Sequence, residues 1–259
     1  MCTVVILRRP GTAWPLLLGA NRDEMLNRPW KSPARHWPDR DVVAGLDELA
    51  GGTWMGLNDS SVVACILNRH GSLGPAPGKR SRGELVLEAL DHADATDAAG
   101  ALRGINPQAY RPFNMLIADN RDAWWLSLSD AKATMRLERI PEGLSMFTAY
   151  DRNDKQDPRI ATYLPRFQAA SPPNPDAGDW KAWQGLLAST EADGTPRAMS
   201  FHTDGGFGTS SSSLLGLPSP ETAFGGDKKR PLWLVAAGAP ESAPFEPVDI
   251  SAPPRPGLH

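Results

Sequence analysis

Cysteine, histidine clusters and long apolar runs are all scarce in this sequence. Only two of the 259 residues are cysteine, which is too few for a disulfide framework or, by themselves, for a four-ligand zinc site. The five histidines are scattered, without a pair at helical spacing or a Cys/His cluster. No apolar run reaches the roughly 18 residues that a membrane-spanning helix needs. We therefore expect no metal site and no membrane span.

Charge of one sign and the common nucleotide and esterase motifs are also lacking. The 27 basic and 30 acidic residues give a net charge of −3, whereas nucleic-acid binders are usually basic overall or on one face. The glycine-rich segment 205–208 lacks the Lys-Ser/Thr ending of a phosphate loop, and no Gly-x-Ser-x-Gly elbow is present. Residues 3–7 form an apolar run too short for a secretory signal. These observations predict a reduced cytoplasmic protein without cofactor or nucleic-acid partner.

Strand and helix signals occur in separate blocks. Short apolar runs bounded by turn residues predict strands over 2–8, 15–20, 42–46, 53–57, 62–67, 114–118, 124–128, 134–139, 199–203, 214–217 and 231–236. Helices are expected from a capping box at Ser81 and Glu84, over 96–103, from Asp157-Pro158 to about 167, and from Asp179. Blocks of this kind favour an α+β fold. We expect one domain over 1–238, followed by a tail, 239–259, that holds six prolines.

Cys2 is a candidate nucleophile because of its place in the chain. Removal of Met1 leaves a free α-amine on Cys2, and the reference pKa of that amine, about 7.7–8.0, suits a general base for the thiol of the same residue. The alternative is a small apolar residue in the first strand. Cys65, in the middle of an apolar run, is expected to be a core residue.

Polar side chains follow several of the predicted strands. Asn21, Arg22, Asp23 and Glu24 come directly after one apolar run, Asn68 follows another, and Asn114 stands at the head of a third. Rigid strand ends commonly present functional groups, although solvated turns have the same composition.

Taken together, these segments resemble the NRDE family, also called the transport and Golgi organisation family. The resemblance rests on Met1-Cys2-Thr3, Asn21-Arg22-Asp23-Glu24, Trp54-Met55-Gly56 and Leu67-Asn68, and extends through 113–119 and 208–212. The family in turn is similar to the cysteine N-terminal-nucleophile hydrolases, which include penicillin V acylase and bile-salt hydrolase. The resemblance implies a four-layer αββα sandwich of the N-terminal-nucleophile hydrolase type.

The same resemblance implies roles for individual residues. Cys2 matches the nucleophile, Asp23 the acid that hydrogen-bonds around it, and Asn68 an oxyanion-hole donor. Arg22 is a candidate replacement for an arginine that the acylases carry where this chain has Ala20. Two further departures are Ala149, in place of an asparagine, and Ser210, in place of a motif arginine; Asn114 or Asn153 would have to compensate unless hydrolysis has been lost.

Four residues near these motifs are candidate substrate contacts. Asn21 and Asn114 carry amides next to the proposed site. His70 either contacts substrate or is a solvated loop residue. Trp54 either lines an apolar acyl pocket or fills the core.

Two functions fit these features. The first is an amidohydrolase that cleaves a linear C–N amide bond through a thioester on Cys2, with a small-molecule substrate that has an apolar part. The basic residues near these motifs either favour an anionic group on that substrate or form a solvated rim. The second is a non-catalytic carrier of haem or an acyl-CoA-like lipid on the same fold. Cys2 and Asp23 favour the enzyme, whereas Ala149 and Ser210 favour the carrier.

Overall fold

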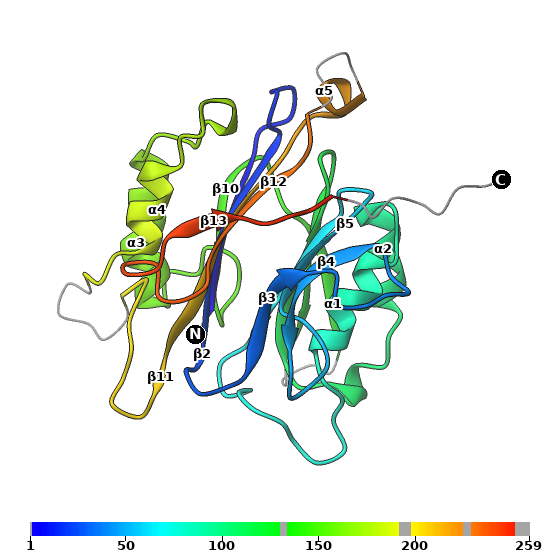
Figure 1. The fold of residues 1–259 in the computed structure, drawn as a ribbon. Helices are drawn as coiled ribbons and strands as arrows, with labels where there is room; N and C mark the ends of the chain where they lie inside the picture. The colour runs from blue at the N-terminus through cyan, green and yellow to red at the C-terminus, as the bar shows by residue number, and fades with distance from the viewer. Residues whose placement is uncertain (1, 130–133, 192–197, 225–228, 252–259) are drawn as a thin grey trace.

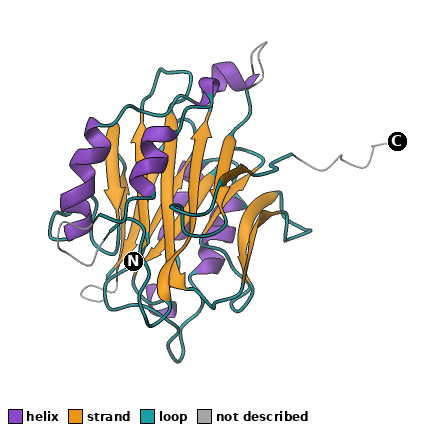
Figure 2. Ribbon diagram, turned by 60° about the vertical axis from the view of Figure 1, so that its left-hand side comes forward, coloured by secondary structure: helices purple, strands orange, loops and turns teal. Residues whose placement is uncertain are grey.

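The computed structural model describes residues 2–129, 134–191, 198–224 and 229–251, which form two stacked antiparallel sheets with helices on both outer faces (Figure 1). The expected α+β class and its four-layer αββα arrangement are confirmed. Figure 2, turned toward the first sheet, shows helices in front of the strands and behind them. Among the described residues, no helix is long and apolar enough to cross a membrane.

The first sheet has six strands, which in spatial order are β10 (Gly143–Phe147), β1 (Thr3–Arg8), β2 (Leu16–Met25), β11 (Phe207–Leu217), β12 (Leu232–Ala236) and β13 (Phe245–Pro247). The second sheet has seven, β3 (Trp30–Ala34), β4 (Val42–Asp47), β5 (Met55–Asn58), β6 (Val63–Asn68), β7 (Phe113–Ala118), β8 (Ala123–Leu128) and β9 (Met135–Arg139).

Helices α3 (Pro158–Ala169) and α4 (Lys181–Leu187) cover the first sheet, while α1 (Gly83–Leu90) and α2 (Ala95–Arg103) cover the second. Three short elements complete the chain: α5 (Pro220–Phe224), η1 (Pro107–Ala109) and η2 (Pro175–Ala177).

The N-termini of α3 and α1 test the capping signals predicted from the sequence. Asp157 caps α3 as predicted, because its carboxylate accepts the backbone N–H of Arg159 at 2.8 Å. The capping box predicted for α1 does not form. The Ser81 hydroxyl accepts only the N–H of Gly83, at 3.3 Å, and the Glu84 carboxylate instead binds Arg80 and the Tyr110 hydroxyl.

Side-chain alternation along the strands of the first sheet builds two separate cores. Val4 and Ile6 of β1 point toward the second sheet, whereas Val5 and Leu7 point toward α3 and α4. Cys2 packs against the core between the sheets. Because of this alternation, neighbouring residues of one strand contact different layers, either the second sheet or the helices α3 and α4.

Several strand boundaries differ from the sequence predictions. β2 continues through Met25, five residues beyond its expected end, because β11 pairs with it over this whole extension, whereas β1 pairs with it only as far as Asn21. Residues 199–203 carry only an isolated bridge between His202 and Gly208, and β3 and β10 were not predicted. Within the expected proline-rich tail, β13 pairs with β12; the last prolines of that tail lie outside the described residues.

Candidate functional site

The Asn-Arg-Asp-Glu motif lies inside β2 and not beyond the end of a strand. Across the sheet, Asn21 pairs with Thr3 on β1, and Asp23 pairs with Thr209 on β11. A bulge between Thr209 and Ser211 leaves Ser210 without a residue directly opposite it on β2. The motif is therefore a buried part of the sheet, and successive side chains must leave it on opposite faces.

Asp23 points toward the helix layer and forms a buried ion pair there. Its carboxylate lies 2.8 Å from Nη1 of Arg159 on α3, and the two side chains are 0% and 3% exposed. Thr209 donates its hydroxyl to the same carboxylate at 2.9 Å, and Arg159 also donates to Thr3 Oγ1 at 2.8 Å. One arginine thus joins α3, β1 and β2.

Sequence reasoning missed Arg159, although one signal was present. The Asp157-Pro158 cap places Arg159 in the first turn of α3, where the helix dipole disfavours a cation. A basic side chain at that position calls for an acidic partner elsewhere in the fold.

Cys2 leaves the sheet on the opposite face, toward the second sheet. Its Sγ donates to the backbone carbonyl of Asp23 at 3.6 Å and not to the carboxylate. Burial raises the pKa of the Cys2 thiol above its ordinary value, and the negative charge of Asp23 raises it further. The thiol is therefore protonated at neutral pH, and any nucleophilic role requires a base. Met1, whose expected removal would free that base, lies outside the described residues.

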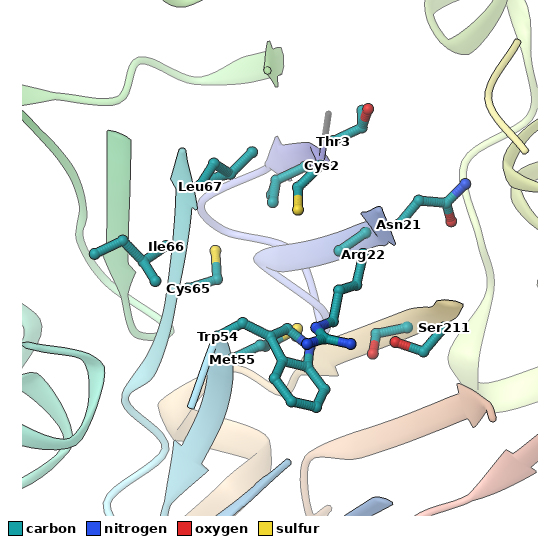
Figure 3. Close-up of a pocket in the computed structure, with 13 residues that line it drawn as sticks. Cys2, Thr3, Asn21, Arg22, Trp54, Met55, Cys65, Ile66, Leu67 and Ser211 are labelled. Atoms are coloured by element: carbon teal, nitrogen blue, oxygen red, sulfur yellow. The ribbon is translucent and has the colours of Figure 1, made fainter. Parts of the chain in front are cut away.

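Two cavities of very different size meet at Cys2. A cleft of about 500 Å³ opens on one side, where Cys2, Asn68 and Trp54 all contribute to its walls. A cavity of about 20 Å³ lies between the sheets, against Cys2, Cys65 and Trp54. Figure 3 shows the sulfur atoms of Cys2 and Cys65 pointing into this narrow space. Cys65 is buried as predicted.

Arg22 also faces the second sheet, where its guanidinium lies 4.2 Å from the ring centroid of Trp54 (Figure 3). Its Nη1 donates to the Ser210 hydroxyl at 3.0 Å, and Nη2 lies 3.9 Å from Glu24. Ser210 is the position at which the resemblance leads us to expect an arginine. The Arg22 guanidinium therefore lies next to position 210, where the arginine expected from the resemblance is absent.

Asn68 is the last residue of β6 and lines the 500 Å³ cleft, as does Cys2. Its side chain is half-buried, and among the described residues its amide has no hydrogen-bond partner. Because this amide lines the cleft and has no partner within the described part of the chain, it is available to a ligand.

The other predicted contact residues lie outside this cleft, apart from Trp54. The side-chain nitrogen of Asn21 donates to Leu187 O and Met199 O, both at 2.9 Å, on the helix side of the sheet. His70 is exposed and stacks on Tyr150 with ring centroids 5.7 Å apart.

Asn114 is fully buried and its hydrogen-bonding capacity is used within the protein. It donates to Thr148 O at 2.9 Å and Tyr150 O at 2.7 Å, and it accepts from Arg69 at 2.7 Å and Trp125 at 3.2 Å. Asn114 thus ties β7 to the chain that follows β10.

Asn153 has a similar structural role, since its side chain accepts the N–H of Met146 at 2.7 Å. The candidates for the missing stabilising group are therefore both engaged. Over the described ranges, no cluster of three or more His, Cys, Asp or Glu side chains is arranged to hold a metal ion.

The fold is similar to solved structures of an acid amidase and a bile acid hydrolase. An N-acylethanolamine-hydrolyzing acid amidase ortholog from Caenorhabditis elegans superposes with a TM-score of 0.58 at 14% identity, covering 89% of this chain and 98% of the other. The C2A mutant of conjugated bile acid hydrolase from Clostridium perfringens gives 0.51 at 11% identity, covering 96% and 97%. These likenesses show a fold of the N-terminal-nucleophile hydrolase type.

Sequence comparison identifies closer relatives. The chain is 34% identical over 114 residues to the Transport and Golgi organization 2 homolog of Mus musculus, and 32% identical to the corresponding protein of Bos taurus. Each match spans 41% of this chain and 40% of the relative, so the match covers about two fifths of the length of these curated proteins. Residues 1–167 match the family described as Transport and Golgi organisation 2, and with this match over more than half its length the chain belongs to that family.

Proposed function

We propose that this chain is an N-terminal-cysteine amidohydrolase that cleaves a linear C–N amide bond through a thioester on Cys2. The observation that carries the proposal is the meeting of three features at one cleft of about 500 Å³: the Cys2 thiol, the unpaired amide of Asn68 and the Arg22 guanidinium. The similarly folded acid amidase and bile acid hydrolase support the reaction class by their names.

The Cys2 α-amine, freed by removal of Met1, is the base in the proposed reaction. Its reference pKa of about 7.7–8.0 allows it to take the thiol proton near neutral pH. This step is needed because burial and Asp23 raise the thiol pKa and so disfavour a preformed thiolate. Asp23 holds the sulfur through its backbone carbonyl.

The sulfur of Cys2 then attacks the amide carbonyl carbon, and the Asn68 amide donates to the oxyanion that develops. The Arg22 guanidinium adds positive charge on the same side of the sheet. The C–N bond breaks as the Cys2 ammonium returns its proton to the leaving nitrogen. Water, deprotonated by the same amine, attacks the thioester, releases a carboxylic acid and restores the thiol.

Intact mass and thioester trapping test this proposal. The purified protein should lack the mass of Met1, and brief exposure to an activated acyl ester should add one acyl group to Cys2. Cys65→Ala is the matched control, since loss of this buried thiol should leave the acylation unchanged. Retained Met1 together with unmodified Cys2 would refute the mechanism.

A ligand carrier is the second candidate, and it has support of its own. Ala149, where the related enzymes have an asparagine, is buried with no polar side-chain atom to offer. The Cys2 thiol is also protonated in the folded protein, as its raised pKa indicates. A carrier of haem or an acyl-CoA-like lipid would bind its ligand stoichiometrically with Met1 in place and show no turnover of any amide.

A further inference from the structure

The charges that line the 500 Å³ cleft are not balanced by one another. Four basic and three acidic side chains contribute to its walls: Arg22, Arg28, Lys79, Arg82, Asp23, Glu24 and Asp47. All of the acids have arginine partners. Asp23 pairs with Arg159 at 2.8 Å, Asp47 with Arg28 at 2.7 Å, and Glu24 lies 3.9 Å from both Arg22 and Arg28.

Lys79 and Arg82 are different, because no acidic group within the described ranges lies at ion-pair distance from either. Arg82 donates to the carbonyls of Ser72 and Pro112, both at 2.9 Å, and Lys79 donates to the carbonyl of Gln108 at 2.7 Å. Carbonyl dipoles solvate these cations but do not neutralise them.

Arg111 places a third cation behind the same wall, and no acidic group in the described part of the chain lies at ion-pair distance from it. It donates to the carbonyls of Gly71 at 2.9 Å and Gly74 at 3.1 Å, and so holds the loop that contributes Gly74 to the cleft. Burial, followed by repulsion from Arg111, lowers the pKa of Arg82 to about 10. The guanidinium remains charged at neutral pH, in a partly desolvated place where a bound anion would relieve the repulsion.

The room available around Cys2 also favours a ligand in the charged cleft. The cavity between the sheets, at about 20 Å³, has room for about one water molecule. The body of any ligand at Cys2 therefore has to occupy the charged cleft.

We infer that the wall formed by Lys79 and Arg82 binds a carboxylate, and that the ligands of this site are compact anionic amides. The inference rests on the proposed function only in placing an amide at Cys2. The planar guanidinium of Arg82 matches a carboxylate in bidentate geometry, and Lys79 adds a mobile point charge at the rim. The carboxylate belongs either to the acyl group or to the leaving amine.

Matched ligand pairs test this inference by calorimetry on the full-length Cys2→Ala protein, which is unable to form a thioester. Succinic acid monoanilide against butyranilide places the carboxylate on the acyl side, and 4-acetamidobenzoate against acetanilide places it on the amine side. We expect one carboxylate member to bind about ten-fold or more tightly than its neutral partner, with a preference that falls as salt is raised.

Substitutions then assign the preference to this wall. Arg82→Gln should abolish it and Lys79→Gln should reduce it, whereas the exposed controls Arg103→Gln and Lys155→Gln should leave it unchanged. If Arg82→Gln unfolds through loss of its carbonyl contacts, Lys79→Gln still decides the question, because Lys79 is exposed. Equal affinities within both pairs, or a preference that both cleft variants retain, would overturn the inference.

Turnover by the unaltered protein separates the two proposals. Hydrolysis of the neutral amides as fast as the anionic ones would contradict the inference and leave the proposed function standing. Carboxylate binding that depends on Arg82, without any thioester on Cys2, would support the inference and contradict the amidohydrolase.

Discussion

The buried ion pair between Arg159 and Asp23 gives the most direct test of how this site is held together. Replacing Arg159 with methionine keeps most of the side-chain volume and removes the guanidinium that pairs with the Asp23 carboxylate at 2.8 Å. The Asp23 carboxylate then keeps the Thr209 hydroxyl, at 2.9 Å, as a donor, and Thr3 loses the donor at its own hydroxyl. The buried carboxylate then loses the arginine that lies 2.8 Å from it.

The expected size of the effect follows from the exposure of the pair. At 3% and 0% exposed, the two side chains are shielded from water, and breaking such a pair costs about 3–5 kcal/mol. For a chain of this size that corresponds to a fall in melting temperature of about 6–20 °C. An exposed pair contributes about 0–1 kcal/mol, so Arg139→Met, which loses a surface partner in Asp122 with the arginine 61% exposed, is the matched control.

Urea unfolding followed by tryptophan fluorescence measures both variants. Adding Asp23→Asn to Arg159→Met should recover stability, because a neutral amide is buried at lower cost than a carboxylate that has lost this arginine. The coupling free energy between the two substitutions should exceed about 1 kcal/mol. The reasoning fails if Arg159→Met loses no more stability than Arg139→Met. It also fails if Asp23→Asn lowers the stability of the Arg159→Met variant by as much as it lowers that of the unaltered protein.

Three further predictions concern the cleft. Asn68→Ala should lower turnover of a hydrolysed amide by about 10²–10³, measured by steady-state kinetics. It should change unfolding stability by less than about 0.5 kcal/mol, because the amide has no hydrogen-bond partner among the residues that the structure describes; an equal loss of stability would make it a structural residue. Iodoacetamide should label Cys2 many-fold faster than Cys65, whose pKa burial raises to about 12. Because the Cys2 pKa is raised as well, labelling of Cys2 should accelerate from pH 7 to pH 9; faster labelling of Cys65 in peptide maps would contradict this. Gly45→Ala should weaken ligand binding, since the new Cβ would lie 2.5 Å from the ring of Trp54 and displace that ring from the cleft wall.

Gly100→Ala is the matched control for the last of these predictions. A Cβ at Gly100, on α2, meets nothing within 4 Å. Unchanged calorimetric affinity in both glycine variants would show that the position of Trp54 does not shape the cleft.

Local sequence signals predicted the class of fold and the nucleophile candidate. The apolar runs of β1, β6 and β7 bury continuous faces, and Asp157-Pro158 begins α3 because a cap and a first-turn proline act within one helical turn. Cys65, between apolar neighbours, is in the core for the same reason. The end of β6 near Asn68 was also visible, because the apolar run stops at Leu67 and a polar segment with Gly71 follows.

Only the tertiary structure decided how the polar motif is used. β2 could extend through Asn21 and Asp23 because β11 pairs with this part of the strand. The β11 residue opposite Asp23 is Thr209, which is 186 residues away in the sequence. Arg159, 136 residues from Asp23, supplies the counter-charge that makes burial of that carboxylate tolerable.

The same distinction explains which asparagine is free. Asn21, Asn68 and Asn114 look alike as polar residues beside apolar runs, yet two of their amides are engaged by chain segments far away in sequence. Alternation along a strand determines from sequence that neighbouring side chains leave on opposite faces. Which face meets a helix, which meets the second sheet and which opens onto a cleft depends on contacts between distant segments, and those exist only once the chain has folded.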